Sequence, residues 1–155
     1  MAAAGQAAML ENAQSIIGYT FTDASILWEA LQAPGAPRFD TNGRDFSNGQ
    51  KRLALVGDAV LKLVLLDEWY RGPRGIQIGN NQVATIGSNS NLAQTGRSHS
   101  LDTCIHNNPS AWGAVSNGVM AQTVEAILGA VWLDSGAGPM GAVTAVMNTL
   151  GLTAT

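Results

Sequence analysis

The amino-acid sequence predicts an all-α domain, because its two longest apolar stretches have the length and the spacing of helices. They cover residues 50–70 and 117–135, and each sets a carboxylate inside a run of Leu, Val, Ile and Ala. Clusters of glycine and proline stop both stretches, at Arg71-Gly-Pro-Arg-Gly75 and at Ser135-Gly-Ala-Gly-Pro139. A chain of 155 residues buries roughly 68–70% of its unfolded surface, which is enough for one core.

The remaining elements follow from local start and stop signals. Asp23 is a candidate N-cap, and residues 34–49 are rich in Gly, Pro, Asp and Asn, which predicts a long loop. Gly79-Asn80-Asn81 is a candidate helix start, and Ser100 is a candidate cap for the element after it. The predicted helices lie near residues 6–17, 23–33, 50–70, 78–98, 100–106, 117–135 and 139–150.

These elements are expected to form one domain, residues 10–152, after a flexible N-terminus at residues 1–9. Neither an internal repeat nor a second domain is recognised in the sequence.

Two acidic residues, Asp58 and Glu125, require an explanation, since an ionised carboxylate among apolar residues is costly to desolvate unless a cation or hydrogen-bond donors meet it. Positions three or four apart share one face of a helix. Ala54 precedes Asp58 by four residues, and Gln122 precedes Glu125 by three. Acids at all four positions would make a cluster suited to magnesium. Here only half of each pair is acidic.

Two glycines lie inside the same predicted helices. Gly57 and Gly129 each cost about 1 kcal/mol relative to alanine in a helix interior, so a compensating interaction is expected. A close crossing of the two helices at these glycines would supply it, and would bring Asp58 and Glu125 toward each other. The alternative is that both glycines are merely tolerated.

The sequence resembles the ribonuclease III endonuclease domain in four segments that occur in the correct order between residues 10 and 136. That family's signature helix reads roughly Glu-Arg-Leu-Glu-Phe-Leu-Gly-Asp-Ala-Val-Leu, and its second acidic segment reads Asp-x-x-Glu-Ala-x-x-Gly-Ala-x-x-Leu-Asp. The corresponding segments here are Lys51-Arg-Leu-Ala-Leu-Val-Gly-Asp58-Ala-Val-Leu61, Gln122-Thr-Val-Glu125-Ala-Ile-Leu-Gly129-Ala-Val-Trp-Leu-Asp134, Ile17-Gly-Tyr-Thr-Phe21 and Ser88-Asn-Ser-Asn-Leu-Ala93.

The resemblance implies a ribonuclease III-like helical fold, with the family's four metal-site acids at Ala54, Asp58, Gln122 and Glu125. Asp58 and Glu125 then remain as the remnant of the catalytic site and as metal ligands, with Gln122 as a weak ligand through its amide oxygen. Losing two negative charges weakens a site for a hard dication, so magnesium binding is expected to be weak or absent.

The family's dimer contact is also altered in this chain. Leu55 stands where the family commonly has a phenylalanine that packs across a twofold interface, so the resemblance implies a homodimer through the signature helix around Leu55, with a smaller contact. Lys51 stands where the family has an acid. The family's appended double-stranded-RNA-binding domain is not expected in this chain.

Composition limits the choice of partners. The net charge is −3, with only two lysines and six arginines, so the chain alone is expected to bind double-stranded RNA weakly. Charged residues make up 12% against about 25% in typical domains. A surface with so little charge favours an oligomer or a subunit of a larger RNA–protein assembly.

The single cysteine, Cys104, makes no internal disulfide, which favours a reducing intracellular compartment. Neither a targeting signal nor a membrane-spanning run is predicted, and the sequence does not distinguish cytoplasm, nucleus and mitochondrion. His99 and His106 are interpreted as structural histidines. Of the tryptophans at 28, 69, 112 and 132, three lie in apolar helical patterns, and Trp112 in its loop is the better candidate for contact with a partner. Asp67 and Glu68 are expected to face solvent.

Two functions remain open from the sequence. One is a catalytically impaired ribonuclease III-like protein associated with double-stranded RNA processing, acting as a dimeric scaffold or RNA-associated subunit. The other is an active magnesium-dependent endoribonuclease that uses Asp58 and Glu125.

Overall fold

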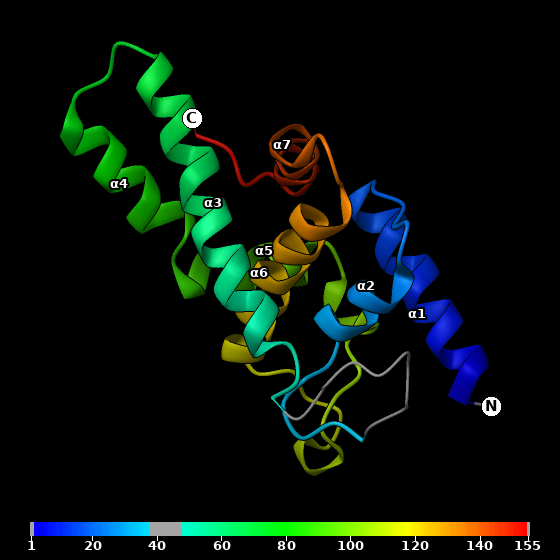
Figure 1. Cartoon of the computed structure of the whole chain (residues 1–155). Helices are drawn as coiled ribbons and strands as arrows, with labels where there is room; N and C mark the ends of the chain where they lie inside the picture. The colour runs from blue at the N-terminus through cyan, green and yellow to red at the C-terminus, as the bar shows by residue number, and fades with distance from the viewer. Residues whose placement is uncertain (1, 38–47, 155) are drawn as a thin grey trace.

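The computed structural model describes residues 2–37 and 48–154 of the chain (Figure 1). Within these residues it is helical, and its only β pairing is an isolated bridge between Gln32 and His106. The elements in order are α1 (Ala2–Ile17), α2 (Ala24–Ala30), α3 (Lys51–Arg71), α4 (Ile76–Ile86), α5 (Asn89–Ser98), the 3₁₀ turns η1 (Leu101–Cys104) and η2 (Pro109–Ala111), α6 (Asn117–Asp134) and α7 (Pro139–Leu150).

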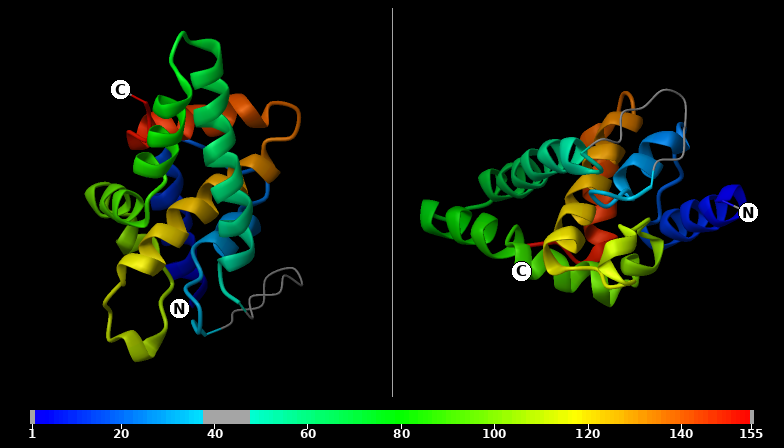
Figure 2. Two further views of the ribbon diagram at one scale, coloured as in Figure 1. Left: turned by 90° about the vertical axis from the view of Figure 1, so that its left-hand side faces the viewer. Right: turned by 90° about the horizontal axis from the view of Figure 1, so that it is seen from below.

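Helix α6 is the centre of the fold. It packs most extensively on α3, which crosses it, and also on α5, α7 and α2 (Figures 1 and 2). Because neighbours surround it, every residue from Met120 to Val131 is buried except Gln122 and Glu125. Helix α4 lies alongside the C-terminal half of α3 and extends away from this core. Within the middle of α6, therefore, only Gln122 and Glu125 are partly exposed.

The predicted crossing of the two long helices is confirmed. A Cβ atom on Gly57 would overlap the main-chain carbonyl of Glu125 and lie 3.0 Å from the amide nitrogen of Gly129. A Cβ atom on Gly129 would overlap the carbonyl oxygen of Leu53. The backbones of α3 and α6 thus touch at this point, and only glycine permits that approach.

A second long-range connection joins the start of the chain to the end of α6. The Asp134 carboxylate accepts hydrogen bonds from the Tyr19 hydroxyl and from the amides of Thr22 and Asp23, each at 2.9 Å. Burial, with the Asp134 hydrogen bond and charge adding to it, raises the pKa of Tyr19 to about 12. The segment that leads into α2 is held in place by these bonds.

Several element boundaries differ from the predictions. Helix α1 begins at Ala2, within the range 1–9 that was expected to be flexible, because its alanines have high helix propensity. The predicted helix at 78–98 is wrong as one element. It breaks at Gly87, which packs against Leu61, and Ser88 then caps α5 by accepting a hydrogen bond from the amide of Asn91. Helix α4 also begins earlier than predicted, at Ile76 and not at Gly79-Asn80-Asn81.

The two predicted caps have different outcomes. Asp23 caps α2, accepting from the amide of Ser25 at 3.0 Å, as predicted. Ser100 makes no side-chain cap and adopts a left-handed conformation, so the predicted helix at 100–106 is the short turn η1. Helix α2 ends at Ala30, three residues earlier than expected. The predicted loop at 34–49 lies largely at residues 38–47, outside the described residues, as do Arg38 and Arg44.

Candidate functional site

Asp58 and Glu125 lie on either side of the glycine crossing. Asp58 follows Gly57 on α3, and the carbonyl group that Gly57 approaches is that of Glu125 on α6. Both side chains are half-buried. Burial, with the negative charge of Asp58 adding to it and the positive charge of Lys62 opposing it, raises the pKa of Glu125 to about 7. The two carboxylates therefore interact electrostatically, as their sequence positions led us to expect.

Lys62 is the third member of this site, and sequence reasoning missed it. Its ammonium group lies 2.9 Å from the Asp58 carboxylate, one helical turn along α3. A lysine four residues after an aspartate is a favourable helical pair, so the spacing could have indicated it. Lys62 thus supplies a positive charge that acts on both acids.

The other two candidate positions contribute differently. Ala54 is only 5% exposed, packs in the core and carries no ligand atom. Gln122 is half-buried, and its side-chain oxygen is fully buried without a hydrogen-bond partner among the described residues. An unpaired buried acceptor costs about 1–3 kcal/mol. The side-chain oxygen of Gln122 could therefore accept a hydrogen bond or bind a cation.

These residues only partly fit a divalent metal. The described residues contain no group of three or more His, Cys, Asp or Glu side chains arranged to hold a metal ion. Two carboxylates and the Gln122 oxygen are available, and one of the carboxylates already pairs with Lys62. Magnesium demands octahedral oxygen coordination and relies on anionic ligands. Water would have to complete most of that coordination.

The remaining candidate residues lie outside the Asp58–Glu125 site. Asp67 pairs with Arg71 on the surface of α3, at 3.1 Å. Cys104 is buried, as predicted, and burial raises the pKa of its thiol. His106 stacks on the buried Trp28 and bonds to Gln32, a structural position. His99 bonds to the carbonyl of Thr95.

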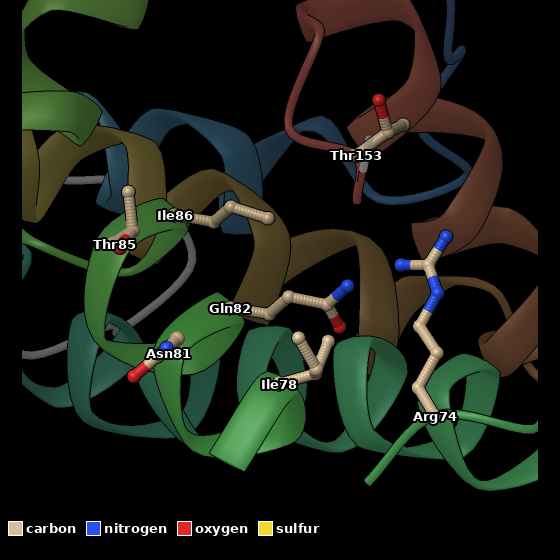
Figure 3. Close-up of a pocket in the computed structure, with 7 residues that line it drawn as sticks. All are labelled: Arg74, Ile78, Asn81, Gln82, Thr85, Ile86 and Thr153. Carbon is tan, nitrogen blue, oxygen red and sulfur yellow. The ribbon is translucent and has the colours of Figure 1, made fainter.

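A cavity of about 570 Å³ lies elsewhere, beside α4 (Figure 3). In the close-up, Gln82 extends from α4 toward the side on which Arg74 and Thr153 lie. Neither Asp58 nor Glu125 lines this cavity, so it is separate from the site described above. Its lining residues are Arg74, Ile78, Asn81, Gln82, Thr85, Ile86 and Thr153.

Known proteins share this helical architecture. Two structures of the nuclease domain of ribonuclease III from Campylobacter jejuni superpose with TM-scores of 0.71 and 0.75. They are 24% and 23% identical to this chain, and the alignments cover 90% and 91% of it and 92% and 95% of those chains. At this identity the likeness defines the class of fold, a ribonuclease III nuclease domain.

Sequence comparison extends this result to the family. The model of the Ribonuclease-III-like family matches residues 38–149. Ribonuclease 3 of Vibrio cholerae is 32% identical over 126 residues, which cover 78% of this chain and 52% of that protein. The chain belongs to the ribonuclease-III-like family, and it spans about half the length of this relative. None of the described helices is long and apolar enough to cross a membrane.

The half-buried acid Glu125 gives the domain a defined pH dependence. Its pKa of about 7 in the folded state lies above the ordinary value of 4.5 for this side chain, so the folded state holds the proton more tightly. The stability that this proton contributes is fully present below about pH 4.5 and is lost as the pH rises to about 7. In metal-free buffer, Glu125→Gln should therefore raise the free energy of unfolding by about 1–3 kcal/mol near pH 8, with a smaller gain near pH 5.

Denaturant unfolding of both chains across this range measures the effect. A gain that stays constant with pH would contradict the prediction.

Proposed function

We propose that this chain is a catalytically impaired ribonuclease III-like protein, associated with double-stranded RNA processing as a dimeric scaffold or an RNA-associated subunit. The carboxylate pair is the observation that carries the proposal. Asp58 is paired with Lys62, and Glu125, with a pKa of about 7, is still partly protonated near neutral pH. Both effects lower the negative charge on which a hard dication depends.

The neighbouring positions support the same function. Ala54 fills space in the core without a ligand atom, and Gln122 offers a neutral oxygen where the family has an acid. The ammonium group of Lys62 offsets part of the charge of the two carboxylates, so the domain does not need a metal ion to fold. A domain that serves in assembly and not in cleavage needs no such ion.

Incubation of the purified chain with long duplex RNA and magnesium or manganese tests the proposal. We expect no cleavage above that of an Asp58→Ala variant. The matched control is Asp67→Ala, which removes an exposed acid from the same helix. Specific cleavage that disappears with Asp58→Ala and persists with Asp67→Ala would refute catalytic impairment.

An active magnesium-dependent endoribonuclease is the second candidate. The unpaired buried oxygen of Gln122 favours it, because together with Asp58 and Glu125 it provides three oxygen donors on two crossing helices. A bound magnesium ion would supply a metal-activated water for hydrolysis. In that case Asp58 and Glu125 would hold the ion, and Lys62 would have to release Asp58 first.

A homodimer through the signature helix forms part of the proposal. Leu55 is 77% exposed on α3, and Leu133 is 54% exposed on α6. Between them lies a cavity of about 340 Å³, which is lined by the apolar residues Ile26, Leu53 and Val56 and, in addition, by the charged residues Glu29 and Arg52. An apolar side chain beside a mainly apolar cavity is self-complementary under a twofold axis, since each copy can fill the cavity of the other. One of the two Campylobacter structures concerns a region involved in dimer formation of that nuclease domain.

The variant Leu55→Asp tests this interface. A carboxylate placed among the apolar residues of the partner's cavity, and beside its Glu29-lined rim, should weaken dimerisation at least about tenfold, equivalent to about 1.4 kcal/mol. Tyr70→Asp is the control, since Tyr70 is 80% exposed and lies at the other end of α3. Analytical ultracentrifugation over a concentration series measures the dissociation constant. Equal weakening by both variants would argue against an interface centred on Leu55.

A further inference from the structure

The fold does not explain Trp112. Its side chain is 94% exposed, and it ends the turn η2 in the connection between η1 and α6. Its backbone is left-handed, with φ 53° and ψ 39°, a conformation that few residues other than glycine adopt. An indole that is exposed to this degree adds little hydrophobic stabilisation to the fold, and its left-handed backbone conformation is unfavourable. The residue therefore has a use outside the packing of this chain.

The loop that carries Trp112 is held in a fixed shape. Asn108 accepts hydrogen bonds from the amide and the hydroxyl of Ser110, at 3.0 and 2.9 Å. Asn107 donates to the carbonyl of Ala114 at 2.8 Å, which closes the loop. Arg97 on α5 donates to the carbonyl of Val115 at 2.6 Å. The loop extends from the body of the domain before α6 begins, and an ordered loop presents its side chain at low entropic cost (Figures 1 and 2).

The sequence around the indole leaves the approach of a nucleic acid unopposed. The segment from 103 to 124 contains no aspartate or glutamate, and no lysine or arginine, although the chain carries 11 acids and a net charge of −3. Amides and hydroxyls fill the loop instead. The chain neighbours of Trp112 are Ala111 and Gly113, which have small side chains and leave both faces of an indole that is 94% exposed open to a planar ligand. A negatively charged backbone can approach this segment without meeting acidic side chains along it.

We propose that Trp112 is a stacking site for an unpaired nucleobase of RNA. Every base has a π-face, so an exposed indole binds bases without strong sequence preference. Bases are available for stacking in loops, bulges and single strands, and they are not available inside a duplex. This inference rests on the proposed association with RNA and adds that this protein contacts an unpaired base, at a place separate from Asp58 and Glu125.

Tryptophan fluorescence and affinity measurements on the full chain test the inference. The probes are a single-stranded oligonucleotide, a perfect duplex, and the same duplex closed by a loop. Single-stranded and looped RNA should quench the fluorescence of the natural chain, and Trp112→Phe, which keeps Trp28, Trp69 and Trp132, should abolish that quenching. Trp112→Ala should weaken binding of both RNAs at least about fivefold. Tyr70→Ala removes another exposed aromatic side chain and should leave binding unchanged.

The outcomes separate this inference from the proposed function. Single-stranded RNA bound equally by the natural chain and by Trp112→Ala overturns the inference. Binding of the perfect duplex alone also overturns it and leaves the proposed function in place. Failure to bind any of the three RNAs counts against both. A Trp112→Ala variant that keeps RNA binding but loses dimerisation in the ultracentrifuge would make Trp112 a protein contact and refute the inference.

Discussion

We expect Gly57→Ala to lower the free energy of unfolding by about 3 kcal/mol, a large share of the stability of a domain of this size. The added methyl group would overlap the carbonyl of Glu125 and press on the amide of Gly129. Both are backbone groups, so no side-chain rotation relieves the clash, and α3 has to move away from α6. Because 1 kcal/mol shifts the melting temperature by about 2–4 °C for such a chain, a fall of about 6–12 °C is expected in calorimetry.

Gly141→Ala provides a matched control for the glycine crossing. Gly141 lies in α7, has an ordinary negative φ, and a Cβ there meets nothing within 4 Å. The same substitution should be neutral or stabilise the fold by up to about 1 kcal/mol, since alanine is the better helix former. If both variants melt at the temperature of the natural chain, the backbones of α3 and α6 do not touch at Gly57.

The second large effect concerns the two lost acids. Restoring them with Ala54→Glu and Gln122→Asp should lower stability without metal by several kcal/mol. Ala54 is nearly fully buried, and like charges about 4 Å apart repel by about 4 kcal/mol per pair at an effective dielectric of about 20. Millimolar magnesium should recover much of this loss in the double variant. It should change the melting temperature of the natural chain little, because Lys62 already offsets the charge of Asp58.

An uncharged double variant distinguishes the effect of charge from the effect of side-chain size. Ala54→Gln with Gln122→Asn changes the side-chain volumes by similar amounts, so this variant should lose stability through packing but should not recover it with magnesium. A melting temperature of the natural chain that rises steeply with millimolar magnesium would contradict the proposed role of Lys62.

The sequence predicted the parts of the fold that local chemistry determines. The long helices α3 and α6 lie within a few residues of their predicted bounds, because apolar spacing and Gly/Pro stop signals mark them. Gly57 and Gly129 predicted the crossing, since glycine in a strong helix requires a compensating contact. These two residues also gave the approximate place of Asp58 and Glu125.

What the sequence could not provide depends on tertiary contacts. Residues 78–98 were predicted as one helix, but the chain breaks at Gly87, which lies beside Leu61, 26 positions earlier in the chain. The sequence analysis missed Lys62, since its effect on Glu125 requires knowing that the two residues lie close together. The cavity between Leu55 and Leu133 exists only once α3 and α6 have crossed. Pairs distant in the chain leave no local pattern.

The bonds to Asp134 affect the order in which the chain folds. Thr22 donates to a carboxylate 112 positions further along the chain, so the segment that leads into α2 lacks its anchor until α6 has been synthesised. Contacts of such long range slow folding, because the chain loses entropy before they form. The segment before α2 therefore gains this anchor only after α6 has formed, and a nascent chain cut off before α6 is expected to remain unfolded and open to proteolysis.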